Sequence, residues 1–238
     1  MFDHHQNRLT ETLPLSRMRV IDVHEAQRRR KAMVAVELWN LRTDFEQAIE
    51  IVPPHWVDDD EIFALGEHYD LLLFERFSDG TLLVTPPPGF HSGVRNADLV
   101  FVIRRWAETA GGGTVSSCNG GLALPDGSLF APDAAFIAPN RMIPDESEGA
   151  YPMLAPDAVF ELLSRSDRVR TTMRKMRTYL RNGVRLAVLI DPYNRRVYVG
   201  REDDREPRSL GYVDALDCSP VMPGFVLDVA AVTRNARR

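Results

Sequence analysis

The chain has 238 residues, of which 44% are hydrophobic and 26% charged, and this composition is typical of a globular protein with a substantial core. No apolar run approaches the roughly 20 residues of a membrane span, and the first residues lack the pattern of a signal peptide. The cysteines Cys118 and Cys218 are far apart and form no C-x-x-C pair, which argues against a disulfide scaffold or a zinc site and favours a reducing, cytoplasmic location.

The net charge of −5 is unevenly distributed along the chain. Residues 161–205 contain twelve Arg or Lys and six Asp or Glu, a balance of +6, so the remainder carries −11. Overall acidity argues against nucleic-acid binding, whereas a basic zone on an acidic body is compatible with a surface for a phosphate backbone. The alternative is an ordinary solvated helix face.

Lysine is rare in this chain. Of the 29 basic residues only Lys31 and Lys175 are lysines. A lysine offers a compact charge that can titrate, which arginine cannot offer. We therefore single out Lys175 as a candidate functional residue, with chance retention as the alternative.

Residues 1–55 are expected to form a largely helical N-terminal extension. Hydrophobic residues recur at helical spacing from about Val23 to Ile51, and Pro53-Pro54 ends the pattern. No chemistry is apparent in this part. The main domain is expected over residues 56–229, followed by a basic tail over 230–238.

Helices and strands alternate along the main domain. The pattern predicts, in order, a short helix with an N-cap among residues 58–60, a β-hairpin, an amphipathic helix and two strands, at 61–67, 71–77 with 81–85, 92–110, and 114–124 with 129–137. A loop over 139–156 follows as a candidate flap. A strand at 158–163, a helix at 167–181 with Ser166 as N-cap, a strand at 185–190 and an antiparallel edge at 196–200 and 210–213 complete the series.

The strand–helix–strand unit over 158–190 predicts a parallel crossover, while the hairpins before it predict antiparallel pairs. We therefore expect an α/β fold with one central mixed β-sheet flanked by helices.

Two acids lie in apolar strand sequences. Glu161 follows Ala158-Val159-Phe160, and an unpaired carboxylate buried there would cost several kcal/mol. Asp133 precedes the apolar run 134–137. The ordinary explanations are a salt bridge to a helix arginine for Glu161 and an exposed strand end for Asp133. Together with Lys175, however, the two acids are the parts needed to hold a divalent cation against a phosphodiester.

The lysine is out of its common place. In the usual nuclease arrangement a lysine lies two residues after the second acid, where this chain has Leu163. Lys175 lies in the following helix, on the same face as Tyr179, and that face could turn toward the acids. Tyr179 then either lines the site or packs in the core.

A series of short motifs resembles a known family. The segments are Glu75–Gly80, Arg95–Leu99, Leu124–Gly127, Ala131–Asp133, Pro156–Ser164, Lys175-Met176, Asn182–Val184, Leu189–Pro192 and Met222–Asp228. As a set, between about Trp56 and Val229, they resemble the Uma2 endonuclease family of the PD-(D/E)XK, restriction-endonuclease-like superfamily.

This resemblance implies a metal-dependent nuclease core. Asp133 and Glu161 would be metal ligands and Lys175 the displaced catalytic lysine. Asp98 matches an acid that the family usually has on its first core helix, and would be a third carboxylate. Glu75 matches a family position to which we assign no role.

Three functions remain open at this point. The first is a DNA endonuclease dependent on Mg²⁺ or Mn²⁺, acting as a homodimer, in which the Leu162 carbonyl could add a metal ligand. The second is a catalytically inactive nuclease-fold module that binds nucleic acid or protein. The third is a metal-dependent hydrolase of a smaller phosphate ester.

Overall fold

The computed structural model describes residues 38–39, 41, 45–141, 143 and 151–234. Its centre is a six-stranded sheet in the order β11-β10-β9-β8-β7-β4. These strands are β4 (Thr114–Ser117), β7 (Ala134–Ile137), β8 (Ala158–Leu162), β9 (Leu186–Asp191), β10 (Arg196–Arg201) and β11 (Arg208–Gly211). β8 and β9 pair in parallel and the other neighbours are antiparallel. The predicted α/β fold with a central mixed sheet is therefore confirmed.

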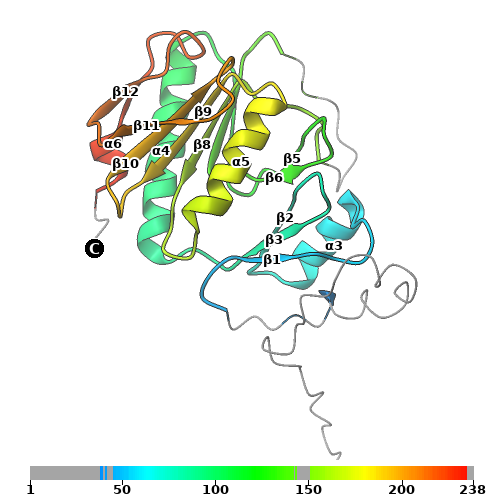
Figure 1. Cartoon of the computed structure of the whole chain (residues 1–238). Coiled ribbons are helices and arrows are strands. Elements are labelled where there is room, and N and C mark those ends of the chain that lie inside the picture. The colour runs from blue at the N-terminus through cyan, green and yellow to red at the C-terminus, as the bar shows by residue number, and fades with distance from the viewer. Residues whose placement is uncertain (1–37, 40, 42–44, 142, 144–150, 235–238) are drawn as a thin grey trace, which may run out of the picture.

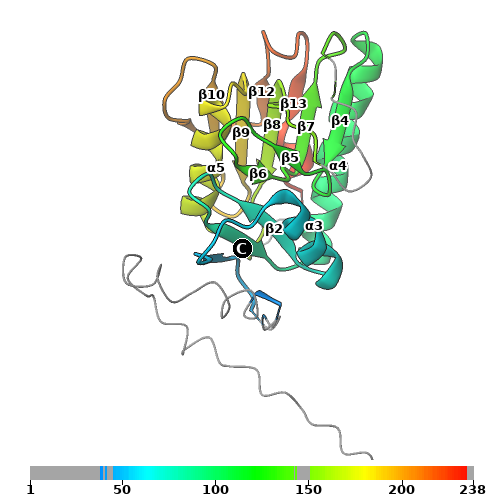
Figure 2. The ribbon, with the colours of Figure 1, turned by 90° about the vertical axis from the view of Figure 1, so that its right-hand side faces the viewer.

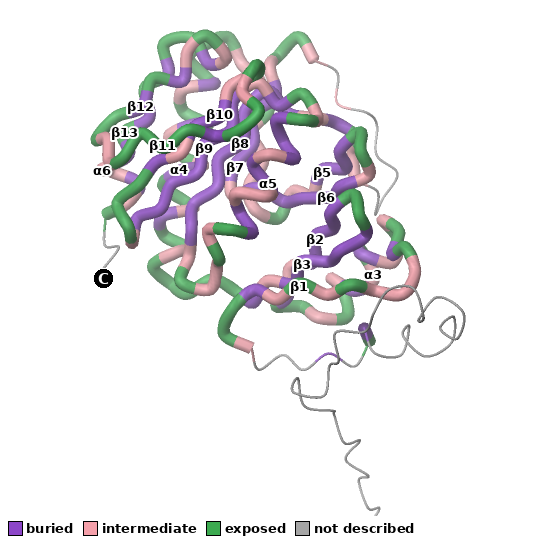
Figure 3. The backbone as a smooth tube through the Cα atoms, in the orientation of Figure 1, coloured by how far each residue is buried: buried purple, intermediate pink, exposed green. Residues whose placement is uncertain are grey.

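Each face of this sheet is covered by a long helix. Helix α4 (Phe90–Thr109) lies on one face and α5 (Val169–Arg181), the crossover between β8 and β9, on the other (Figure 1). Side chains of β8 alternate accordingly: Phe160 and Leu162 join the core under α4, while Val159, and Leu163 just after the strand, join the core under α5. All residues of β8 and β9 are buried (Figure 3), as their nearly continuous apolar sequences predict.

The start of α5 differs from the sequence prediction. Arg168, not Ser166, is the N-cap residue, and it makes no side-chain capping bond. The Ser166 hydroxyl instead lies 2.7 Å from the Ser164 hydroxyl, and the Ser164 amide donates to Asp167 Oδ2. The polar side chains thus stabilise a turn before the helix. At the other end Asn182 is the C-cap and Gly183 adopts a positive φ of 91°, a conformation that favours glycine.

A second, five-stranded sheet begins below the central sheet with β1, β2 and β3 and reaches up beside α5 with β5 and β6 (Figure 1 and Figure 2). Its order is β1-β3-β2-β6-β5, with strands β1 (Ile49–Ile51), β2 (Leu73–Arg76), β3 (Leu82–Thr85), β5 (Leu122–Ala123) and β6 (Leu129–Phe130). The predicted hairpin is the β2–β3 pair. Helix α3 (Asp59–His68) packs on this sheet and begins with a capping box between Asp58 and Glu61.

The end of the expected N-terminal helix is wrong. Residues 49–51 form β1, which pairs antiparallel with β3. Ile-Glu-Ile alternates with the period of a strand, so Ile49 and Ile51 pack in the core beneath α3 while Glu50 reaches α5. Most of the expected helix, together with residues 1–22 before it and residues 144–150 of the expected flap, lies outside the described residues. The domain boundary at residue 55 stays a prediction.

The end of the described chain packs against α4. Strands β12 (Ala215–Asp217) and β13 (Val226–Asp228) form a two-stranded sheet, and the short helix α6 (Val229–Val232) follows. Among the helices described, none is both long and apolar enough to span a membrane.

We predict that Phe160→Ala lowers the free energy of unfolding by about 3–5 kcal/mol, because Phe160 is fully buried between β8 and α4 and its removal leaves a cavity. Urea denaturation followed by circular dichroism measures the loss. Phe90→Ala is the matched control, since the Phe90 side chain is 82% exposed and its loss should cost under about 1 kcal/mol. Equal losses in the two variants would contradict the packing described.

Candidate active site

The register of β7 and β8 brings the two predicted acids together. Ala134 pairs with Phe160, so one further step places Asp133 opposite Glu161. Residues directly opposite each other in an antiparallel pair share a face of the sheet. Glu161 lies between Val159 and Leu163, which pack under α5, so both carboxylates belong to the α5 side.

Helix α5 delivers Lys175 to the same place. The Lys175 ammonium lies 2.8 Å from Glu161 Oε1, and the Tyr179 hydroxyl, one helical turn later, donates to the same oxygen at 2.8 Å. Lys175 is 5% exposed and Glu161 6%. The lysine next to the acids therefore comes from helix α5. Leu163, which lies two residues after Glu161 where nucleases commonly have the lysine, packs in the core.

Glu75 joins this cluster from the second sheet. Its Oε1 lies 2.8 Å from the Lys175 ammonium and accepts a hydrogen bond from the Ala131 amide at 2.8 Å. The Phe130 ring lies 5.5 Å from the ammonium and contacts Tyr179 edge to face. Glu75 had no role assigned from the sequence, although, like Glu161, it is a glutamate within an apolar strand sequence.

Asp133 is held at both carboxylate oxygens. Its Oδ1 accepts from the Asn96 side-chain amide at 2.8 Å, and its Oδ2 from the Leu162 amide at 2.7 Å. Asn96 is the second residue that the sequence analysis missed. It lies in the same motif as Asp98, and only the helical register distinguishes which of the two faces the site.

The structure does not bring Asp98 into the cluster. Asp98 is exposed on α4 and, with Phe101 and Val232, lines a separate cavity of about 290 Å³ between α4 and α6. Side chains two positions apart in an α-helix point in directions that differ by about 200°, so Asn96 and Asp98 cannot face the same neighbour. The expectation that Asp98 supplies a third carboxylate is corrected on this ground, and Glu75 is the third carboxylate of the cluster.

The cluster holds more negative than positive charge. Glu75 and Glu161 contact the Lys175 ammonium, and Asp133 interacts with it electrostatically, so the three carboxylates and one ammonium give −2 when all are ionised. Burial raises the pKa of Asp133 to about 6, although the Leu162 amide and Lys175 oppose the rise. Burial likewise raises the pKa of Glu161, against the attraction of Lys175. The cost of desolvating these acids is therefore not fully offset by the protein's own groups.

The two donors keep their protons. Burial alone would lower the pKa of Lys175, but Glu161 and Glu75 outweigh it and raise the pKa, so Lys175 is a cation at neutral pH. Burial and the Glu161 carboxylate raise the pKa of the Tyr179 hydroxyl. Lys175 thus offers a fixed positive charge rather than a proton acceptor.

A hard divalent cation fits the donor set of this cluster. Among the residues described, no group of three or more His, Cys, Asp or Glu side chains is arranged to hold a metal ion. Mg²⁺, however, is usually held by one or two carboxylates together with water and substrate phosphate. Within the described part, both partners of Glu161 bind Oε1, which leaves Oε2 for a ligand. Asp133, Glu161 and the excess negative charge therefore suit such an ion.

Comparisons with known proteins agree with this fold. The model of the Uma2 family, described as "Putative restriction endonuclease", matches residues 64–230, more than half of the chain. A solved structure from Anabaena variabilis ATCC 29413, described as a putative nuclease belonging to DUF820, is similar with a TM-score of 0.57 and 22% sequence identity. The match covers 68% of this chain and 89% of the solved one. At 22% identity it shows that the two chains share a fold. No protein of curated function matches the chain.

Asp133→Asn should change the pH dependence of stability in metal-free buffer. Because the pKa of Asp133 rises from 3.8 to about 6 on folding, the parent binds the proton more tightly when folded and loses stability as the pH rises through this window. The asparagine variant lacks this titration. From about pH 4.5 to about pH 7.5, the difference in unfolding free energy should therefore move in favour of the variant, by about 2 kcal/mol.

Urea denaturation with EDTA at a series of pH values measures this difference. The absolute stability of the variant also reflects its altered hydrogen bonds to Asn96 and Leu162, so the pH-dependent part is the informative quantity. A difference that is constant with pH, or that moves in favour of the parent, would contradict a raised pKa at Asp133.

Lys175→Met should destabilise the protein by about 3–5 kcal/mol, because it leaves Glu75 and Glu161 buried without their cation. Adding Glu75→Gln to this variant should recover part of the loss, since one unpaired carboxylate is then removed. Thermal and urea unfolding measure both effects. Arg104→Met is the control, because the Arg104–Glu108 pair is exposed and should contribute under about 1 kcal/mol.

Proposed function

The chain belongs to the Uma2 family of putative restriction endonucleases, and on that premise we propose that it is a metal-dependent endonuclease that hydrolyses DNA phosphodiester bonds. One observation carries the proposal. Asp133 just before β7, Glu161 on β8 and Lys175 on α5 form one buried cluster, in which Lys175 contacts Glu161 and interacts electrostatically with Asp133. Acids with excess negative charge beside a fixed ammonium are suited to holding a cation and a phosphate group together.

In this proposal Asp133 and Glu161 hold Mg²⁺ or Mn²⁺, and the Leu162 carbonyl is a further candidate ligand. The bound ion would polarise the scissile phosphate and lower the pKa of a bound water. A bound divalent cation would also neutralise the two negative charges that Lys175 leaves uncompensated in the cluster.

The chain's own residues position the reacting groups. Lys175 remains charged and stabilises the negative charge that develops on the phosphate oxygens. Glu75 and Tyr179 hold Lys175 in position. Glu75, on the second sheet, binds the Lys175 ammonium, and the Tyr179 hydroxyl donates to the same Glu161 oxygen, Oε1, that the ammonium contacts. Asn96 orients the Asp133 carboxylate. Lys175 would therefore orient the attacking water and stabilise charge without taking the water's proton.

DNA as the substrate, a homodimer and a cytoplasmic location also belong to the proposal. A cut through both strands of a duplex needs two such centres, which two copies of the chain would supply. The cysteines are both free in the structure, which suits a reducing compartment.

The second candidate is a nuclease-fold module that binds without cleaving. The observation in its favour is the burial of the lysine: its ammonium already contacts two carboxylates, and the residue is only 5% exposed. Calorimetry that shows no divalent-ion binding, together with salt-sensitive DNA binding, would select this function.

Purified protein should nick supercoiled plasmid in Mg²⁺ or Mn²⁺ and should lose this activity in EDTA. Asp133→Asn should lower the nicking rate by at least about 100-fold, because it removes a charged metal ligand. Gel densitometry over time measures the rate, and circular dichroism confirms that the variant is folded.

Asp98→Asn is the matched control, since it removes an acid on α4 that lies outside the cluster. It should cut at the rate of the parent. If Asp133→Asn cuts as well as the parent, the site is misassigned. If the parent does not cut in either ion, the endonuclease proposal is wrong.

A further inference from the structure

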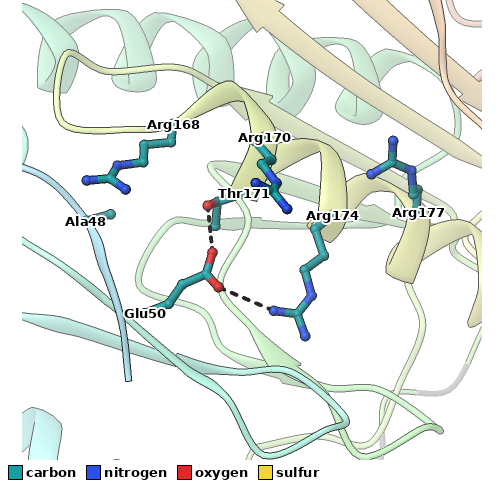
Figure 4. Close-up of a pocket in the computed structure, with 7 residues that line it drawn as sticks. All are labelled: Ala48, Glu50, Arg168, Arg170, Thr171, Arg174 and Arg177. Carbon is teal, nitrogen blue, oxygen red and sulfur yellow. Dashed lines mark hydrogen bonds and ion pairs between the residues drawn. The ribbon is translucent and has the colours of Figure 1, made fainter. Parts of the chain in front are cut away.

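A groove with arginines along its rim runs between the first half of α5 and strand β1. It has a volume of about 650 Å³ and is lined by Arg168, Arg170, Arg174 and Arg177, with Glu50 and Thr171 on its floor (Figure 4). Glu50 accepts a hydrogen bond from Thr171 Oγ1 at 2.8 Å and lies 3.6 Å from Arg174. The lining residues together carry +3.

The arginines follow one face of the helix. Arg170, Arg174, Arg177 and Arg181 are four, three and four residues apart, a spacing that aligns side chains on one side of an α-helix. The stripe is about 16 Å long at 1.5 Å per residue. Lys175 points the other way, into the catalytic cluster. Helix α5 thus carries five basic residues and no acidic one, and only the lysine is turned inward.

The charges of the groove are only partly neutralised. Arg174 pairs with Glu50 and Asp79, and Arg177 with Glu206 at 2.6 Å, but these acids are themselves between 43% and 62% exposed. Pairs between exposed groups contribute little and are exchanged for a stronger anion at small cost. The Arg168 side chain donates to the neutral amide of Gln47, and within the part of the chain that the structure describes neither Arg168 nor Arg170 has an ion pair.

We propose that this groove binds the phosphate backbone of one nucleic-acid strand along the outer face of α5. Guanidinium groups bind phosphate oxygens in a two-pronged geometry, which makes arginine the residue of choice for this contact. Phosphates of one strand follow each other every 3.4 Å along a duplex, so a stripe of about 16 Å spans about five of them. The inference rests on the proposed function for the identity of the substrate. It places the nucleic-acid backbone that flanks the scissile phosphate on the outer face of α5, which the catalytic cluster does not use.

The stripe favours nucleic acid over other anions. A small phosphate ester would occupy one or two of the arginines and leave the remainder without a partner. An acidic peptide is the macromolecular alternative, and it is included in the test as a competitor.

The test measures DNA binding without cleavage. Fluorescence anisotropy with a labelled 20-base-pair duplex, in EDTA and at several salt concentrations, gives the dissociation constant and its salt dependence. Arg170→Gln/Arg177→Gln should weaken binding about 10-fold or more and lower the slope of log affinity against log salt by about 1 to 2. Arg104→Gln/Arg105→Gln on α4 makes the same change in net charge at another exposed position and should change neither quantity appreciably.

Equal losses in the two double variants would overturn the proposal, because they would reflect net charge alone. Absence of DNA binding by the parent would also overturn it, as would competition by poly-glutamate as effective as that by unlabelled duplex. Because the assay contains no divalent ion, a protein that binds DNA through these arginines and fails to nick plasmid would refute the endonuclease proposal and leave this one standing.

Discussion

The buried contact of Lys175 with Glu75 and Glu161 is the interaction on which the rest of the structure depends. A charge in a dry environment must be paired, and these three groups can pair only if β2, β8 and α5 lie in one arrangement. The contact therefore joins the five-stranded sheet to the central sheet. It also fixes the rotation of α5, because Lys175 and Tyr179 must both reach the same oxygen of Glu161.

This cluster is not the arrangement that would make the fold most stable. Apolar residues of similar volume at these positions would avoid the cost of desolvating three carboxylates with one cation. Burial raises the pKa of Asp133 and of Glu161, which is the sign of that uncompensated cost. An uncompensated electrostatic cost of this kind is typical of sites that bind a ligand of opposite charge. A divalent cation, as proposed, is the ligand that suits these oxygen donors.

Helix α5 serves two environments at once. Its inner face supplies Lys175 and Tyr179 to the cluster, together with apolar residues such as Met176 that pack on the sheet. Its outer face supplies the arginine stripe beside β1. The acidic body of the protein thus presents a local positive surface on the element that also carries the candidate catalytic lysine. In a nuclease, binding of the substrate backbone by these arginines would help to position Lys175, because both lie on the same helix.

The sequence by itself determined the local features: the continuous apolar strands β8 and β9, the crossover helix, and the anomaly of Asp133 and Glu161 in apolar surroundings. These follow from periodicity and from the cost of burying charge, which are properties of short segments. Only the tertiary structure decided the partners. Glu75 lies 86 residues before Glu161, Asn96 rather than Asp98 faces Asp133 through the register of α4, and residues 49–51 join a sheet instead of a helix. Each of these depends on which distant segments pack together, and local sequence does not encode that.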